Sequence, residues 1–205
     1  AQREIPLFRG AIIQTMDNAP LLFHNHEKDK LRYSYPLIQY KCINQCAAIV
    51  CVSEGAETIG DFFSNGHLDI RLGQKTMTLD IDSIKATQCL VQTWDDYFIY
   101  HTYKWMPLNQ VNYQRYIQLE SIVDKYAMLE KLLVANILSF AKGLGVYFDK
   151  QVICRLIQVN EPTSMTYKGV KMLSFDIEFK SNISIPDYIG LGKGVSQGHG
   201  IVVKK

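Results

Sequence analysis

The chain has 205 residues, 47% of them hydrophobic and 20% charged, as in ordinary globular proteins, and it is long enough for one large domain or two small ones. The formal net charge is only +2, so composition carries no overall basic signature of nucleic-acid binding, although lysines and arginines gather near residues 28–41 and 193–205. The five cysteines form no CxxC pair, and no apolar stretch of ~18 residues occurs. These features favour a cytoplasmic protein with reduced thiols over a secreted, zinc-binding or membrane-spanning one.

The first half of the chain is predicted to contain strands and one short helix. The strands are expected at Leu7 to Met16, Pro36 to Ile43, Ala47 to Val52, His67 to Leu72 and Thr76 to Ile81. Asn44-Gln45 is a plausible hairpin turn between the second and third of them. The helix is expected at Glu54 to Asn65, where apolar residues recur at helical spacing, with Ser53 as candidate N-cap and Gly66 as the stop.

The second half begins with an aromatic strand, Tyr97 to Trp105, followed by the segment Leu108 to Leu119. Ser121 to Gly143 is the clearest helix of the chain, because its apolar residues recur at intervals of three and four and glycines end it. Further strands are predicted at Gln151 to Val159, Val170 to Phe179 and Ile201 to Val203.

This order of elements predicts an α+β protein made of two β-α-β-β units, that is, tandem ferredoxin-like (RRM-like) subdomains. Trp94-Asp95-Asp96 interrupts the pattern, so we expect an N-terminal subdomain over residues 1–93 and a C-terminal one over residues 94–205. The interruption is short and unlike a flexible linker, which predicts that the two halves pack together.

A glycine-rich segment near the C-terminus is the most informative motif. Gly190, Gly192, Gly194, Gly198 and Gly200 lie within eleven positions, between an apolar lead-in and a predicted strand. Glycine permits positive φ and lets backbone amides approach a partner, so together with Lys193, Lys204 and Lys205 the segment suits the binding of a phosphate backbone. His199 lies inside it, where its ring could stack on a base. The alternative is a flexible tail.

Histidines near the N-terminus are the best candidates for catalysis. His24 and His26 lie between Pro20 and Pro36 among polar and charged residues, where we expect a loop. Histidine has a pKa near working pH and can take a proton from a nucleophile or give one to a leaving group. The alternative is that both are solvated loop residues or that one caps a strand.

These two segments resemble the CRISPR-associated repeat-processing endoribonucleases of the RAMP superfamily. The glycines fit the pattern G-x-G-x5-G-x-G, with His199 in place of the family's frequent aromatic residue. The stretch from Phe23 to His26, followed by the tyrosine-rich residues 32–41, is similar to the histidine-bearing loop and strand of compact family members. The resemblance implies RNA binding and one cut within each CRISPR repeat of the precursor transcript.

A metal-independent mechanism is expected for such a cut, because the sequence shows no acidic cluster typical of a Mg²⁺ site. His26 is the first candidate for proton transfer and His24 the second. Lys30 or Lys41 could neutralise the phosphate charge, and Tyr33 could orient the attacking 2′-hydroxyl. The expected RNA contacts are Gly190, Gly192, Lys193, Gly194, Gly198, His199 and Gly200. No cofactor or metal is expected.

Two other functions stay open at this point. One is a catalytically silent RAMP protein that binds repeat RNA within an effector complex, and the other is a tandem ferredoxin-like protein that binds a small ligand through the glycine loop. Other CRISPR effector subunits and a homodimer are open as partners. The aromatic strand from Tyr97 to Trp105, which includes His101, is expected either to pack in the core or to stack on unpaired bases, as RRM sheets do.

Overall fold

The structure is a computed structural model that describes residues 2–15, 26–27, 30–31, 35–65 and 68–205. The chain divides into two compact units, one of residues Ala1–Gln88 and Ser196–Gly198, the other of residues Cys89–Val195 and His199–Lys205. Helices and strands occur in both, so the predicted α+β class is confirmed. Within the described ranges, no helix is both long and apolar enough to cross a membrane.

The first unit begins with a helix where a strand was expected. After a 3₁₀ turn at Gln2–Glu4, helix α1 covers Ile5–Gln14, with Pro6 in its first turn, where the missing N–H costs no hydrogen bond. Its buried residues are Ile5, Phe8, Ala11 and Ile12. Phe8 lies three positions after Ile5, and Ala11 and Ile12 lie three and four positions after Phe8, which places all of them on one helical face. The strand prediction for Leu7 to Met16 is therefore wrong, because the apolar run has a helical period.

The strands of the first unit pair as separate hairpins in the described ranges. The pairs are β1 (His26–Glu27) with β2 (Lys30–Leu31), β3 (Ile38–Ile43) with β4 (Cys46–Cys51), and β5 (Asp69–Leu72) with β6 (Lys75–Thr78). The predicted turn between β3 and β4 is confirmed, since Asn44 and Gln45 have φ of 49° and 67°, as a type I′ turn requires.

Helix α2 (Glu54–Asn65) has the predicted bounds. Ser53 precedes it with φ of 52°, in the left-handed region and not in the extended conformation typical of an N-cap, and Gly66 lies outside the described residues. Residues from α1, β3, α2 and β5 form the core of this unit: Ile5, Phe8, Ala11, Ile12, Ile38, Tyr40, Phe62 and Ile70.

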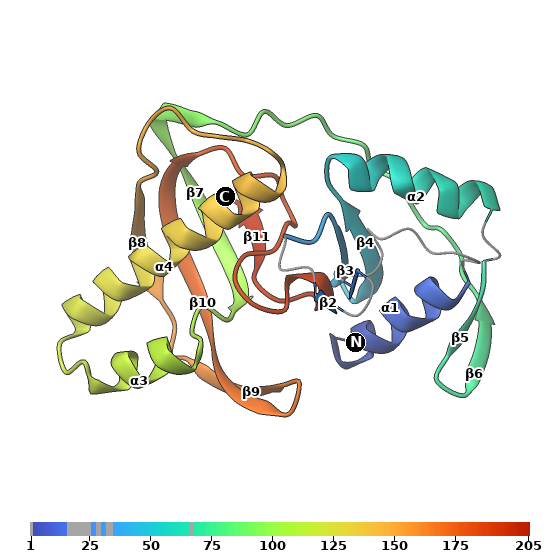
Figure 1. Ribbon diagram of the computed structural model, residues 1–205, viewed down its shortest axis with the longest axis horizontal. Helices are drawn as coiled ribbons and strands as arrows, with labels where there is room; N and C mark the ends of the chain where they lie inside the picture. Colours follow the sequence, from blue (N-terminus) through green and yellow to red (C-terminus); the bar gives the residue numbers. More distant parts are fainter. Residues whose placement is uncertain (1, 16–25, 28–29, 32–34, 66–67) are drawn as a thin grey trace. The chain divides into compact units, whose positions relative to one another are not determined.

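The second unit contains a ferredoxin-like sheet, so the predicted fold is confirmed there. Its four main strands are β7 (Thr93–Trp105), β8 (Cys154–Val159), β10 (Val170–Ile183) and β11 (Ile201–Lys204). They lie in the order β11-β7-β10-β8 with antiparallel neighbours, which is the order 4-1-3-2 for strands counted along the chain (Figure 1). A further strand, β9 (Thr163–Tyr167), forms a hairpin with the first half of β10.

Helix α4 (Ile122–Gly143) lies across this sheet and covers one of its faces (Figure 1). It starts one residue later than predicted, after Ser121, whose hydroxyl accepts a hydrogen bond from the Asp124 amide at 3.4 Å. Its buried side chains are Leu129, Leu133, Ile137, Phe140 and Ala141. The segment Leu108 to Leu119 contains a second helix, α3 (Gln110–Gln118), which has no buried residue and is capped by the Asn109 side chain.

A β-bulge next to the end of β7 brings a tryptophan into the core. Lys104 has φ of 51°, and the register of β7 against β10 shifts at this point, between Phe175 and Ile177. Trp105 is therefore fully buried, and its indole N–H donates to Asn136 Oδ1 of α4 at 2.9 Å. From Phe98 to Tyr103 the residues alternate between the covered and the open face of the sheet, whereas a second register shift lies between Thr93 and Phe98.

Candidate functional site

Only part of the candidate catalytic loop can be placed. His26 lies in β1, opposite Leu31, and Lys30 lies in β2, opposite Glu27, in backbone register. His24 and Tyr33 lie outside the described residues. Two of the five predicted catalytic residues thus lie on two short strands that pair with each other.

Lys41 is described in full, and its position differs from the exposed one that a phosphate contact requires. It lies on β3 opposite Ala48 and is 0% exposed. Its Nζ has no hydrogen-bond partner within the part of the chain that the structure describes. Burial lowers the pKa of Lys41 from 10.5 to about 7, because the charged form loses its hydration. A buried lysine with a lowered pKa is less suited than an exposed one to the predicted neutralisation of phosphate charge.

The residues just before Lys41 form a buried polar contact. Gln39 is fully buried, and its side-chain amide donates to the Tyr35 hydroxyl and to the Pro36 carbonyl, each at 2.9 Å. Ile38 and Tyr40, which alternate with Gln39 and Lys41, belong to the apolar core. Strand β3 is thus buried on both faces, which its sequence does not show, because Gln39 and Lys41 are of types usually found at a solvated face.

The glycine-rich segment is ordered, and its glycines serve close packing. Gly192, Gly194, Gly198 and Gly200 have φ between 65° and 84°. A Cβ atom added at Gly200 would lie under 3.0 Å from the Leu191 carbonyl oxygen, and one at Gly192 would lie 2.9 Å from the Met106 oxygen. The flexible-tail alternative is thereby excluded, and the absent side chains make room for the protein's own atoms.

Hydrogen bonds hold the same segment to β7. The amide of Lys193 donates to Met106 O at 3.1 Å, and that of Gly200 donates to Lys104 O at 3.0 Å. The amide of Leu191 donates to Gly200 O at 2.9 Å. These amides are not available to a phosphate, so fewer backbone donors remain for RNA than the glycine content suggested.

The two side chains predicted to contact RNA from this segment have different environments. Lys193 is exposed. His199 is only 8% exposed, and its ring packs edge-on against Tyr167 of β9, with centroids 5.6 Å apart. This arrangement does not present the His199 ring to a base, because the strand pairing of β9 and β10 places Tyr167 against it. Lys193 is the better placed of the two.

Residues Ser196–Gly198 group with the first unit. The Gln2 side-chain amide donates to Gln197 O at 2.8 Å, and a Cβ at Gly198 would lie 2.8 Å from Gln2 Nε2 and 3.2 Å from Tyr40 O. Gly198 is therefore required by its neighbours in that unit, which sequence reasoning could not identify because Gln2 and Gly198 are far apart along the chain.

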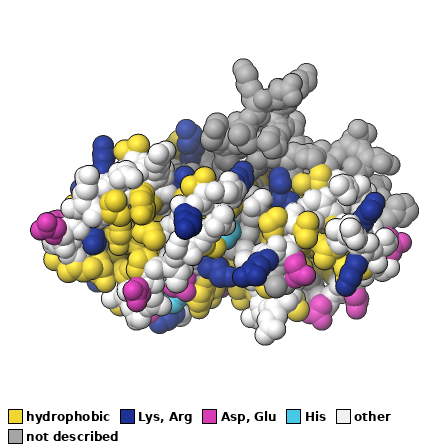
Figure 2. All heavy atoms as spheres, turned by 90° about the horizontal axis from the view of Figure 1, so that it is seen from below, with side chains coloured by type: hydrophobic (Ala, Val, Ile, Leu, Met, Phe, Trp, Pro, Cys, Tyr) yellow, Lys and Arg dark blue, Asp and Glu magenta, His cyan; other side chains and the backbone are white. Residues whose placement is uncertain are grey.

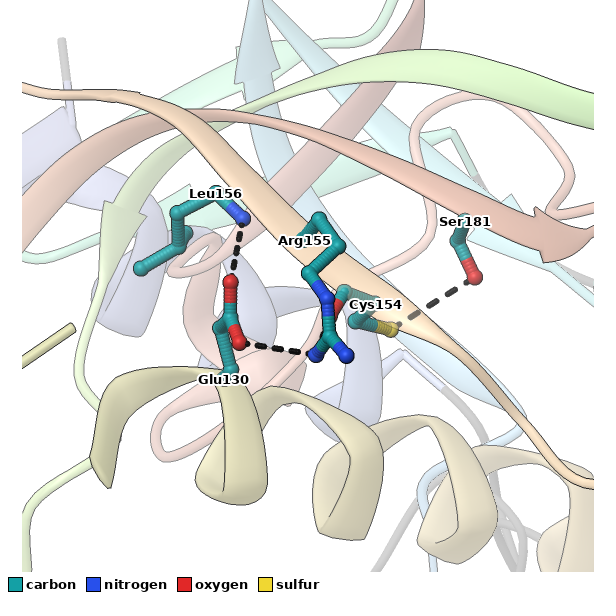
Figure 3. Close-up of polar contacts among 5 residues, drawn as sticks. All are labelled: Glu130, Cys154, Arg155, Leu156 and Ser181. Carbon is teal, nitrogen blue, oxygen red and sulfur yellow. Dashed lines mark hydrogen bonds and ion pairs between the residues drawn. The ribbon is translucent and has the colours of Figure 1, made fainter. Parts of the chain in front are cut away.

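One polar cluster in the second unit was not predicted. Glu130 of α4 accepts hydrogen bonds from the Leu156 amide at 3.0 Å and from Arg155 at 2.9 Å, on the outer edge strand β8 (Figure 3). Beside them, the thiol of Cys154 donates to the Ser181 hydroxyl at 3.5 Å, and burial raises the pKa of this thiol to about 11. Because the thiol is neutral and the Glu130 carboxylate already accepts two hydrogen bonds, this cluster has a structural role: it attaches α4 to β8.

On the face that Figure 2 shows, the residues that the structure describes form no single cationic patch. Lysine and arginine side chains lie at several separate places on the face shown in Figure 2. The described ranges contain no group of three or more His, Cys, Asp or Glu side chains that could hold a metal ion.

The fold defines a class of α+β protein with a 4-1-3-2 sheet, in which a packed glycine-rich segment occupies the place of the second ferredoxin helix. Two family models match the chain, described as the Cas6b N-terminal domain over residues 1–89 and the Cas6b C-terminal domain over residues 92–205. The chain therefore belongs to the Cas6b family. This confirms the resemblance to CRISPR-associated repeat-processing endoribonucleases.

Solved structures agree with this assignment. A crystal structure of Cas6b superposes with a TM-score of 0.90 at 26% identity, covering 100% of this chain and 93% of the other. A crystal structure described as the CRISPR RNA processing endoribonuclease Cas6b gives a TM-score of 0.67 at 28% identity, covering 84% of this chain and 83% of the other. An uncharacterized protein of Methanocaldococcus jannaschii is 39% identical over 100 residues, which are 49% of this chain and 67% of that protein.

Proposed function

We propose that this protein is an endoribonuclease that cleaves CRISPR precursor RNA once within each repeat. The observation that carries the proposal is the superposition of the whole chain on a Cas6b structure with a TM-score of 0.90. A second solved relative, also above 25% identity, is described as a CRISPR RNA processing endoribonuclease. The family likeness extends over both units and therefore includes the histidine-bearing segment and the glycine-rich segment together.

The proposed chemistry requires no metal ion. A base removes the proton of the 2′-hydroxyl, whose oxygen attacks the adjacent phosphorus, while an acid protonates the departing 5′-oxygen. The products are a 2′,3′-cyclic phosphate and a 5′-hydroxyl. His26 is the first candidate for one of these proton transfers and His24 the second, since imidazole exchanges protons near neutral pH. Tyr33 is the candidate for orienting the 2′-hydroxyl.

The lysines differ in how well they are placed to contact a phosphate. Lys30 is the first candidate for neutralising the charge that grows on the phosphate oxygens, because it lies on the short strand that pairs with the strand of His26. Lys41 is second, because it is buried. Lys193 is the candidate phosphate contact of the glycine-rich segment, since its side chain is exposed.

The test is cleavage of a repeat RNA in EDTA. We expect one cut, the two product ends named above, and no cut when the scissile nucleotide carries a 2′-deoxy substitution. His26→Ala should lower the single-turnover rate by about 10²- to 10⁴-fold, the usual effect of losing a general acid or base, with little loss of RNA binding. His67→Ala is the matched control and should cleave at the parental rate.

Each alternative corresponds to a different result. If His24→Ala abolishes cleavage and His26→Ala does not, the roles of the two histidines are reversed. A requirement for Mg²⁺ would refute the metal-independent mechanism. Binding of the repeat without any cleavage would replace the enzyme by the silent RNA-binding protein. Binding of other effector subunits and of a second copy is left open, and sedimentation velocity with and without RNA measures the latter.

A further inference from the structure

The open face of strand β7 carries a row of aromatic and aliphatic side chains. Tyr97, Ile99 and Tyr103 are 47%, 41% and 44% exposed, and His101, between the last two, is half-buried. The residues that alternate with them are more buried, and Tyr100 and Thr102 are almost fully covered. Because α4 covers only the opposite face of the sheet, this row faces solvent.

Two rings of the row stack on each other. His101 and Tyr103 are stacked, with centroids 4.1 Å apart and an angle of 26° between their planes. The Nε2 atom of His101 is buried and has no hydrogen-bond partner among the residues that the structure describes. The row lies on the first strand of the 4-1-3-2 sheet, between β10 and β11 (Figure 1). In RRM sheets, aromatic residues on central strands stack on bases.

Cationic side chains lie beside the row. Lys180 of β10 is opposite Ile99, and its Nζ lies 5.4 Å from the centroid of the Tyr97 ring. On the next strand, Arg155 is opposite Lys180, but its guanidinium is paired with Glu130 of α4. Glu178, opposite His101, is paired with Lys205. Phosphates of a strand whose bases stack on the rings would therefore meet the Lys180 ammonium and a neutralised carboxylate.

We propose that the open face of β7 is a stacking platform for unpaired bases of single-stranded RNA. Tyr97, Tyr103 and His101 contact the bases, and Lys180 contacts the phosphates. The inference rests on the proposed function, which identifies the RNA as the CRISPR repeat. It adds that an unpaired part of this RNA binds on β7. A protein partner is the less favoured occupant, because the cations beside the row would have to be desolvated without a partner charge.

The test uses fluorescence anisotropy with two probes, an unstructured oligouridine and a repeat RNA blocked by a 2′-deoxy nucleotide at the scissile position. Tyr103→Ala and Tyr97→Ala should each weaken binding by about 5- to 100-fold, the effect of removing one stacking ring. Tyr103→Phe should bind like the parent, because the ring remains. Tyr147→Ala is the matched control, since Tyr147 is 86% exposed and lies outside the row. Melting temperatures of all variants should match the parent.

Unchanged affinity of both alanine variants for both probes would overturn the proposal. If the variants change the sedimentation coefficient of the protein and leave RNA affinity unchanged, the face binds protein and the proposal is equally wrong. Single-turnover cleavage over a range of protein concentrations separates this inference from the proposed function. The Tyr97 and Tyr103 variants should need more protein than the parent to reach half of the maximal rate. A parent that cuts no repeat at any protein concentration refutes the proposed function, while oligouridine binding still tests the platform.

Discussion

Replacing Gly200 with alanine should destabilise the protein far more than the same change at another glycine of positive φ. Gly200 has φ of 65°, and an added Cβ would lie under 3.0 Å from the Leu191 carbonyl oxygen. Gly169 has φ of 78° with nothing within 4 Å of the added atom, which makes it a matched control. Both variants incur the backbone strain of alanine at positive φ, about 1 kcal/mol, and only Gly200→Ala adds a clash.

The clash cannot be relieved by a side-chain rotation, because the atom that it meets belongs to the backbone. Leu191 must move away, which breaks the hydrogen bond from its amide to Gly200 O and strains the one from the Gly200 amide to Lys104 O. Two hydrogen bonds at about 1 kcal/mol each and the strain give a total of about 3 kcal/mol for Gly200→Ala. For a chain of this size, the melting temperature should fall by roughly 6–12 °C, against roughly 2–4 °C for Gly169→Ala.

Thermal unfolding followed by circular dichroism, with urea unfolding at 25 °C, measures both variants. Equal losses for Gly200→Ala and Gly169→Ala would refute the argument that glycine is retained at position 200 for packing. If Gly200→Ala instead melts like the parent and loses only RNA binding, the glycine serves the approach of RNA, as its position in the motif first suggested.

Three further predictions follow from single side chains. Because the folded-state pKa of Lys41 is lowered to about 7 from 10.5, the unfolded chain binds more protons between these values, so parental stability should rise from pH 7 toward pH 10.5. This rise in the free energy of unfolding is at most about 1.4 kcal/mol per pH unit and is measured by urea titration. Lys41→Met should remove the rise and should stabilise the protein at pH 7. Lys193→Glu should weaken RNA binding and lower the salt slope of log K by about one or more, whereas Lys142→Glu should leave both unchanged. Asn136→Leu should cost about 1–3 kcal/mol in unfolding free energy, because the buried Trp105 N–H loses its acceptor.

Helix α1, which was mispredicted, and helix α3, whose segment was assigned no element type, show sequence signals that were present but weak. For α1, the helical period and Pro6 in the first turn compete with an apolar run that is equally typical of a buried strand. For α3, the Asn109 cap is readable, but no residue of the helix is buried, so no apolar stripe accompanies it. A helix could be predicted where a capping residue precedes a long apolar stripe, as in α4.

Local chemistry along the chain determined the β3–β4 turn, helices α2 and α4, and the family likeness, because residues close in sequence supply the turn, the apolar stripe or the motif. Tertiary structure alone decided that Lys41 is buried and that the glycines pack against Leu191, Met106 and Gln2. It also decided that one face of β7 stays open. The physical reason is that burial and close approach depend on atoms from segments far apart in the chain, which a local pattern does not contain.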